Sequence, residues 1–247
     1  MSSAISRAAQ STFVERDFLR VREACEVGAA LLRRTPPAPA PYPECVRRPL
    51  VLVTGFGPFE RVRSNPSRAI AAALERRPPE GVRVRACELP VSFVGAPREV
   101  ERFVARHAAE RPVLLLGLGV QKLGYFRFER RARGRYTTKR IDNDGTAGAD
   151  LRRRVGPDRR TKLDLRSLAR LLRSAGARDV RVSNDAGGYV CERTYHALLT
   201  AGAKHGIDAV FLHVPPAKVT RASVQARLVR EWLGCACAGE RTPALGN

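Results

Sequence analysis

Cys191 occupies a position where residue type and spacing suggest covalent chemistry. Residues 179–182 alternate apolar and polar side chains, which predicts a β-strand, and the pair Gly187 and Gly188 follows as a tight turn. Beyond the cysteine, apolar residues recur at helical spacing as far as Gly202. Unpaired N–H groups and the helix dipole favour a nucleophilic thiolate in the first turn of a helix, and can hold an oxyanion. The alternative is a buried cysteine that packs as a small hydrophobic residue.

A cysteine nucleophile needs a base that takes its proton, and a single histidine can serve as both base and acid. His213 ends the apolar run 209–214, a predicted buried strand, where its imidazole can lie at the rim of the sheet. By contrast, His107 lies in a predicted helix, His196 projects from another side of the nucleophile's helix, and His205 lies in a loop. Position in the chain therefore favours His213 as the base. The alternative is a structural histidine that forms hydrogen bonds at the end of the strand.

Strands and helices are predicted to alternate along the chain. The predicted strands lie at 50–53, 82–89, 113–119, 179–182 and 209–214, and the predicted helices begin at Pro66, Pro97, Leu165, Val190 and near Val224. Residues 126–148 read as an irregular region. Continuous apolar strands between helices indicate a mostly parallel sheet covered on both faces. Ligands of such sheets bind beyond the carboxyl ends of the strands, where the cysteine, the histidine and the loop after the first strand would meet.

The chain divides into three predicted parts. Residues 1–34 are expected to form a helical extension, residues 35–49 a Pro/Ala-rich linker, and residues 50–247 one α/β domain. No apolar run approaches the ~20 residues that a membrane span requires. The six cysteines form no regular disulfide framework, so we expect a reducing compartment, the cytoplasm. We expect no metal site, because no cysteine or histidine pairs stand at ligand spacing.

The formal net charge of +21 raises the possibility of an anionic partner. Of the 45 basic residues only five are lysines, and the arginines are scattered through predicted helices, strands and turns. This pattern is more typical of a compositional bias than of a nucleic-acid groove, since no recognised binding motif accompanies it. Non-specific attraction of anions remains an expectation, and the sequence does not define an oligomeric state.

Four segments, in one order along residues 50–233, resemble the pyroglutamyl-peptidase I family (pyrrolidone carboxyl peptidases) of cysteine peptidases. These segments are 52–59 with 64–67, the glutamate segment 128–130 after the glycines at 117 and 119, the nucleophile segment 183–191, and the histidine segment 211–216. The resemblance implies a three-layer α/β/α sandwich around a twisted mixed sheet. It also implies hydrolysis of the amide that follows an N-terminal pyroglutamate in peptides, without a cofactor.

The resemblance further implies roles for individual residues. Cys191 would be the nucleophile, His213 the acid and base, and Glu129 the residue that orients the histidine. Phe56 and Phe59 would lie against the lactam ring.

An arginine that approaches the substrate in bacterial members would correspond to Arg140. Three segments depart from the family pattern, one of them Asp142-Asn143, which lacks the proline common in bacterial members. Glu60-Arg61 replaces a common Gly-Gly pair, and Glu192 stands where Asn or Asp is usual.

Two other functions remain open at this point. A catalytically degenerate scaffold could bind an anionic polymer or a protein partner through its arginine-rich surface. A thiol amidohydrolase could instead act on another small cyclic amide, because the loop after Phe59 is atypical.

Overall fold

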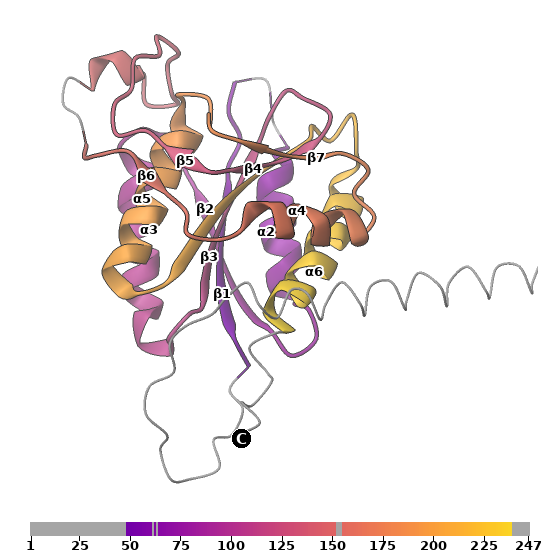
Figure 1. Cartoon of the computed structure of the whole chain (residues 1–247). Helices are drawn as coiled ribbons and strands as arrows, with labels where there is room; N and C mark the ends of the chain where they lie inside the picture. The colour runs from indigo at the N-terminus through magenta and orange to yellow at the C-terminus, as the bar shows by residue number, and fades with distance from the viewer. Residues whose placement is uncertain (1–47, 61, 63, 152–154, 239–247) are drawn as a thin grey trace, which may run out of the picture.

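The computed structural model describes residues 48–60, 62, 64–151 and 155–238, and its middle layer is a six-stranded sheet (Figure 1). The strand order is β2-β1-β3-β8-β4-β7, and all pairings are parallel except that of β4 with β8. The strands are β1 (Leu50–Phe56), β2 (Arg83–Leu89), β3 (Leu114–Val120), β4 (Phe126–Glu129), β7 (Val180–Ser183) and β8 (Asp208–Val214). Two short strands, β5 (Arg131–Ala132) and β6 (Arg159–Arg160), pair separately.

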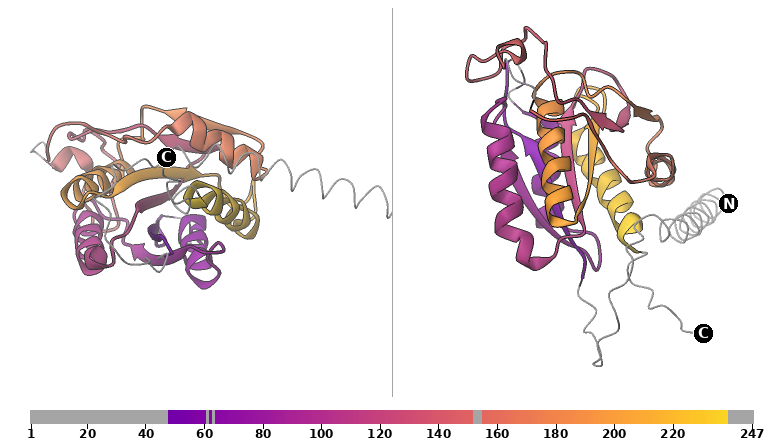
Figure 2. Two further views of the ribbon diagram at one scale, coloured as in Figure 1. Left: turned by 60° about the horizontal axis from the view of Figure 1, so that its bottom comes forward. Right: turned by 60° about the vertical axis from the view of Figure 1, so that its left-hand side comes forward.

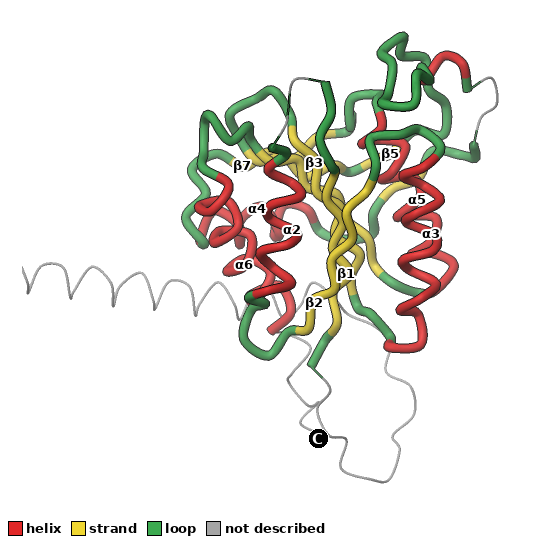
Figure 3. Tube along the Cα trace, turned by 180° about the vertical axis from the view of Figure 1, so that it is seen from behind, coloured by secondary structure: helices red, strands yellow, loops and turns green. Residues whose placement is uncertain are grey.

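Helices cover both faces of the sheet, which confirms the predicted three-layer α/β/α sandwich (Figures 2 and 3). The helices are α2 (Pro66–Arg76), α3 (Gly95–His107), α4 (Leu165–Ser174), α5 (Val190–His205) and α6 (Ala222–Ala238), with short 3-10 turns at Ala108–Glu110 and Gly148–Asp150. One face carries α3 and α5, and the other carries α2, α4 and α6. In the described ranges, no helix is long and apolar enough to span a membrane.

The apolar strands divide the core into two clusters. In β1, Val51 and Val53 pack in the cluster of α2, α4 and α6, whereas Leu50 and Leu52 pack in the cluster of α3 and α5. Successive side chains of a strand point to opposite faces, so a strand covered on both sides must be apolar throughout. Burial on both faces explains why the sequence of β1 is an uninterrupted apolar run.

Two predicted helix starts are confirmed by their caps. The Asn65 side chain accepts a hydrogen bond from the Ser67 N–H at 3.1 Å, and Pro66 occupies the first helical position of α2. The Asp164 carboxylate caps α4 in the same way. These caps satisfy N–H groups that the helix itself leaves unpaired.

Residues 126–129 are not irregular, which corrects the sequence interpretation. They form β4, which lies between β7 and β8 and carries Glu129 into the sheet. The last helix, predicted to begin near Val224, is α6 and begins at Ala222; it packs through Leu228 and Trp232. The predicted extension 1–34 and the linker up to residue 47 lie outside the described residues.

Candidate active site

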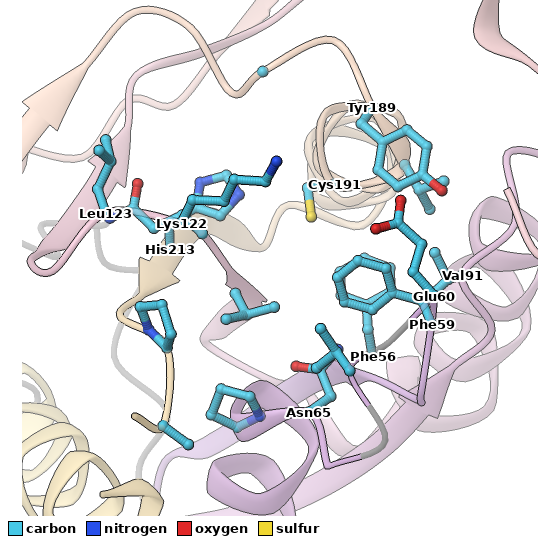
Figure 4. A pocket seen from close by; sticks show the side chains of 18 of the residues that line it. Phe56, Phe59, Glu60, Asn65, Val91, Lys122, Leu123, Tyr189, Cys191 and His213 are labelled. Atoms are coloured by element: carbon cyan, nitrogen blue, oxygen red, sulfur yellow. The ribbon is translucent and has the colours of Figure 1, made fainter. Parts of the chain in front are cut away.

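A cavity of about 700 Å³ opens beyond the carboxyl ends of the central parallel strands (Figure 4). Phe56 ends β1 at this cavity, Val120 ends β3, and His213 lies one residue before the end of β8. The start of α5 brings Cys191 to the same cavity. The site therefore lies at the rim where an α/β sheet is expected to bind its ligand.

The turn before α5 holds Cys191 in the first helical turn. Gly187 and Gly188 have φ angles of 95° and 67°, in the left-handed region that glycine adopts without steric cost. The helix begins after Tyr189, whose side chain forms no capping hydrogen bond. Backbone N–H groups of the first turn are thus available beside the sulfur, where they could bind an oxyanion.

Gly119 of β3 makes room for the sulfur. A Cβ atom built on Gly119 would lie 3.0 Å from Cys191 Sγ. Gly119 pairs with His213 in the parallel ladder of β3 and β8, and the side chains of paired residues emerge on the same face of a sheet. The sulfur and the imidazole, remote in the sequence, consequently lie over the same face of the sheet (Figure 4).

A buried carboxylate holds the histidine ring. His213 Nδ1 lies 2.7 Å from Glu129 Oε1, and the glutamate is fully buried while the histidine is 4% exposed. Arg127 Nε donates to the same oxygen at 2.6 Å, and the Tyr195 hydroxyl donates to the Glu129 carbonyl at 2.8 Å. A carboxylate at Nδ1 favours the tautomer with a proton on that nitrogen, which leaves Nε2 as the proton acceptor.

Burial opposes the thiolate that the helix position of Cys191 was expected to favour. Burial raises the thiol pKa to about 12, and the nearby Glu129 carboxylate raises it further. The charge of Arg140, the cysteine's own backbone N–H and the charge of Arg127 act in the opposite direction, but burial prevails. This direction favours a neutral thiol in the free protein.

Aromatic side chains line the other side of the cavity. Phe56 and Phe59 both contribute, together with Tyr189 from the nucleophile turn. The guanidinium of Arg140 lies 4.2 Å from the centre of the Tyr189 ring, and its Nη2 forms a 2.9 Å ion pair with Glu60. Glu60 has a φ of 45°, so the residue type is unusual for its backbone conformation.

All of the site residues predicted from the sequence lie in or beside this cavity. Cys191, His213, Phe56, Phe59 and Arg140 line it, and Glu129 lies behind the histidine ring.

The other histidines lie elsewhere. His196 contacts the Pro157 carbonyl at 3.0 Å, His107 contacts Glu110 at 2.6 Å, and His205 ends α5. Within the described ranges, no group of three or more His, Cys, Asp or Glu residues could hold a metal.

Sequence reasoning missed a buried ion pair that supports the nucleophile turn. Glu192 is fully buried, and its Oε2 accepts a 2.7 Å hydrogen bond from the Gly188 N–H. Its Oε1 accepts from the backbone N–H of Arg133 at 3.0 Å, and the Arg133 guanidinium binds both Glu192 and Asp185. The signal that was available is an acidic residue in the first turn of a helix, directly after the cysteine.

The same site-bearing part of the chain is similar to known peptidases. Residues 50–225 match the family model described as pyroglutamyl peptidase. The "Pyrrolidone-carboxylate peptidase 1" of Ralstonia nicotianae is 30% identical over 172 residues, which cover 68% of this chain and 78% of the relative. The "Pyrrolidone-carboxylate peptidase" of Streptomyces coelicolor is 32% identical over 181 residues, 67% and 77% of the two chains. The crystal structure of pyrrolidone carboxyl peptidase from Thermus thermophilus superposes with a TM-score of 0.63 at 30% identity, over 74% of this chain and 98% of that one.

Proposed function

The chain belongs to the pyroglutamyl peptidase family, and from this membership we propose that it is a cysteine peptidase that removes an N-terminal pyroglutamyl residue from peptides. The observation that carries the proposal is the His213–Glu129 contact beside Cys191 in one cavity. A thiol, an imidazole and a carboxylate in this order are the parts that nucleophilic attack on an amide requires.

In the first half of the reaction, Cys191 is acylated. The sulfur attacks the pyroglutamyl carbonyl carbon while His213 Nε2 takes the thiol proton. The oxyanion accepts hydrogen bonds from backbone N–H groups of the first turn of α5. The imidazolium is stabilised by Glu129, and it then gives its proton to the departing amine, so that a thioester and a free peptide remain.

In the second half, water releases the acyl group. His213 takes a proton from a water molecule, the hydroxide attacks the thioester carbonyl, and the sulfur leaves. The sulfur regains its proton from the imidazolium, and free pyroglutamic acid departs. The high thiol pKa fits this cycle, because both the starting and final states hold a neutral thiol.

An uncharged lactam suits the aromatic side of the cavity. Phe56 and Phe59 offer flat apolar contact to the ring, and Arg140 lies next to Tyr189 with its charge neutralised by Glu60. Small apolar pockets with a few polar groups are typical for ligands of this kind.

We further propose that the protein acts in the cytoplasm, because the reaction needs Cys191 as a free thiol. Cys191 and Cys87 are free thiols, the state that a reducing compartment maintains. Cell fractionation tests this point: the proposal requires the protein and its activity in the cytoplasmic fraction, and secretion into the medium would contradict it.

Hydrolysis of a chromogenic pyroglutamyl amide tests the proposed function. We expect release of the amine that stops after thiol alkylation, and no release from the matching proline amide, which lacks the lactam carbonyl. An intact protein that cleaves neither amide would overturn the proposal. Cleavage of another cyclic amide in place of the pyroglutamyl amide would assign the thiol chemistry to a different substrate.

A further inference from the structure

We propose that Lys122 and Lys218 form a subsite for the residue that follows the pyroglutamyl group, and that this subsite favours a carboxylate. The inference rests on the proposed function, since it concerns the leaving group of that reaction. It assigns a substrate preference to two residues that take no part in the chemical steps.

The direction of the leaving group follows from the positions of the catalytic groups. Cys191 lies between the aromatic side, with Phe56 and Phe59, and the side that holds His213 (Figure 4). If the lactam ring lies on the aromatic side, the departing amine must point toward the imidazole that protonates it. The rest of the peptide therefore extends over the side of the cavity that His213 shares with Lys122.

Two adjoining loops bring the lysines to this side. Lys122 follows β3, and the preceding Gln121 donates its backbone N–H to the Val214 carbonyl of β8 at 3.1 Å. Lys218 lies in the loop that follows β8. A Cβ atom on Gly124 would lie 3.4 Å from a methyl group of Val219, so the two loops are in contact.

Both lysines are exposed, and both line the cavity. Each lysine is followed in its loop by an exposed apolar residue: Leu123 is 45% exposed and Val219 is 53% exposed. These side chains leave accessible surface for a peptide chain next to the two charges.

The charges of the cavity are unevenly compensated. Arg127 is paired with Glu129, at 2.6 Å, and Arg140 is paired with Glu60, at 2.9 Å. Among the described residues, neither Lys122 nor Lys218 forms an ion pair. The leaving-group side therefore carries two uncompensated ammonium groups.

A carboxylate on the leaving residue has the charge that two ammonium groups attract. It could be the side chain of an aspartate or glutamate, or the α-carboxylate of a pyroglutamyl dipeptide. A lysine at that position would be repelled. The interaction is exposed to solvent, so its effect is expected to be modest and to weaken as salt is added.

Four substrates separate these contributions: pyroglutamyl-aspartic acid amide, pyroglutamyl-alanine with a free carboxylate, pyroglutamyl-alanine amide and pyroglutamyl-lysine amide. We expect kcat/KM for each carboxylate-bearing substrate to exceed that for the alanine amide by about threefold or more, and the lysine amide to be the poorest. The aspartate substrate reports a side-chain carboxylate and the free dipeptide reports an α-carboxylate. A preference for either one supports the inference and identifies its source.

The double variant Lys122→Gln/Lys218→Gln tests whether the lysines cause the preference. Its ratio of kcat/KM between the carboxylate-bearing substrates and the alanine amide should fall to about one. The matched control is Lys204→Gln, an exposed lysine near the far end of α5, which should keep the wild-type ratio. Equal kcat/KM for all four substrates in the wild type, or a preference that survives the double substitution, would overturn the inference alone. Failure to cleave any pyroglutamyl substrate would instead overturn the proposed function.

Discussion

His213 Nδ1 lies 2.7 Å from Glu129 Oε1, although the register of β4 and β8 does not pair these two residues. Glu129 is opposite Phe211, and Arg127 is opposite His213, so the carboxylate reaches the ring diagonally across the antiparallel ladder. All four side chains emerge on the same face of the sheet, since residues two apart in a strand share a face. Strand β4, which runs antiparallel to β8, thus supplies both the carboxylate and the arginine that compensates its charge.

Replacing Glu129 with Gln should lower kcat/KM for a pyroglutamyl amide by about 10²- to 10⁴-fold. The amide can no longer stabilise the imidazolium, and it can present an N–H to Nδ1, which would favour the wrong tautomer. Circular dichroism should show a folded protein. The control is Glu231→Gln, a surface residue of α6 that pairs with Arg227 and should keep full activity. Activity of Glu129→Gln within threefold of wild type would contradict the assigned orienting role.

The rate of Cys191 alkylation by iodoacetamide should rise about tenfold for each pH unit between pH 7 and 9, without a plateau. Burial raises the thiol pKa to about 12, so the reactive thiolate remains a small fraction throughout this range. Peptide mass spectrometry is needed to separate Cys191 from Cys87, whose pKa burial raises to about 11. A plateau at Cys191 below pH 8 would show a preformed thiolate–imidazolium pair and would contradict the neutral thiol.

Replacing Gly119 with Ala should reduce activity by about 10²-fold or more while costing about 1–3 kcal/mol of unfolding free energy. The new methyl group would lie 3.0 Å from Cys191 Sγ and 2.9 Å from Phe211 Cζ, so the sulfur must shift from its position. Urea denaturation measures the loss of unfolding free energy. The control Gly234→Ala creates a 3.3 Å contact with Pro79, away from the cavity, and should retain activity. Equal effects of the two variants on activity would refute a specific role for Gly119.

Replacing Glu192 with Gln should cost about 1–3 kcal/mol of unfolding free energy, because it leaves the Arg133 guanidinium without its buried partner. The nucleophile turn should also loosen, since the Gly188 N–H loses a charged acceptor. We therefore expect a fall in kcat larger than any change in KM. Denaturation in urea measures the change in unfolding free energy, and steady-state kinetics measure the changes in kcat and KM. Unchanged stability together with unchanged kcat would show that the pair does not support the turn.

Sequence patterns predicted the features of the fold and of the site that depend on local structure. The strand, glycine turn and helix around Cys191 are consecutive in the chain, and the caps at Asn65 and Asp164 involve residues only two or three positions away. Such features need no knowledge of tertiary contacts. The family resemblance, rather than periodicity, identified Glu129.

The features that the sequence did not predict arise from long-range contacts. Strand β4 was missed because polar residues, Arg127 and Glu129, occupy the face that packs beneath α5, and they are compatible with burial only as an ion pair. The helix start predicted a lowered pKa for the Cys191 thiol, and this prediction was wrong because burial also depends on long-range contacts. The helix start lowers it locally, but burial by neighbouring elements raises it more.

The most direct test of the proposed site compares amine release from a chromogenic pyroglutamyl amide by His213→Ala and His196→Ala. Both imidazoles are buried, but only His213 lines the cavity with Cys191, whereas His196 contacts the Pro157 carbonyl. The proposed mechanism predicts that His213→Ala loses about 10³-fold or more in kcat/KM and that His196→Ala stays within about tenfold of wild type. Retained activity in His213→Ala, with loss in His196→Ala, would contradict it.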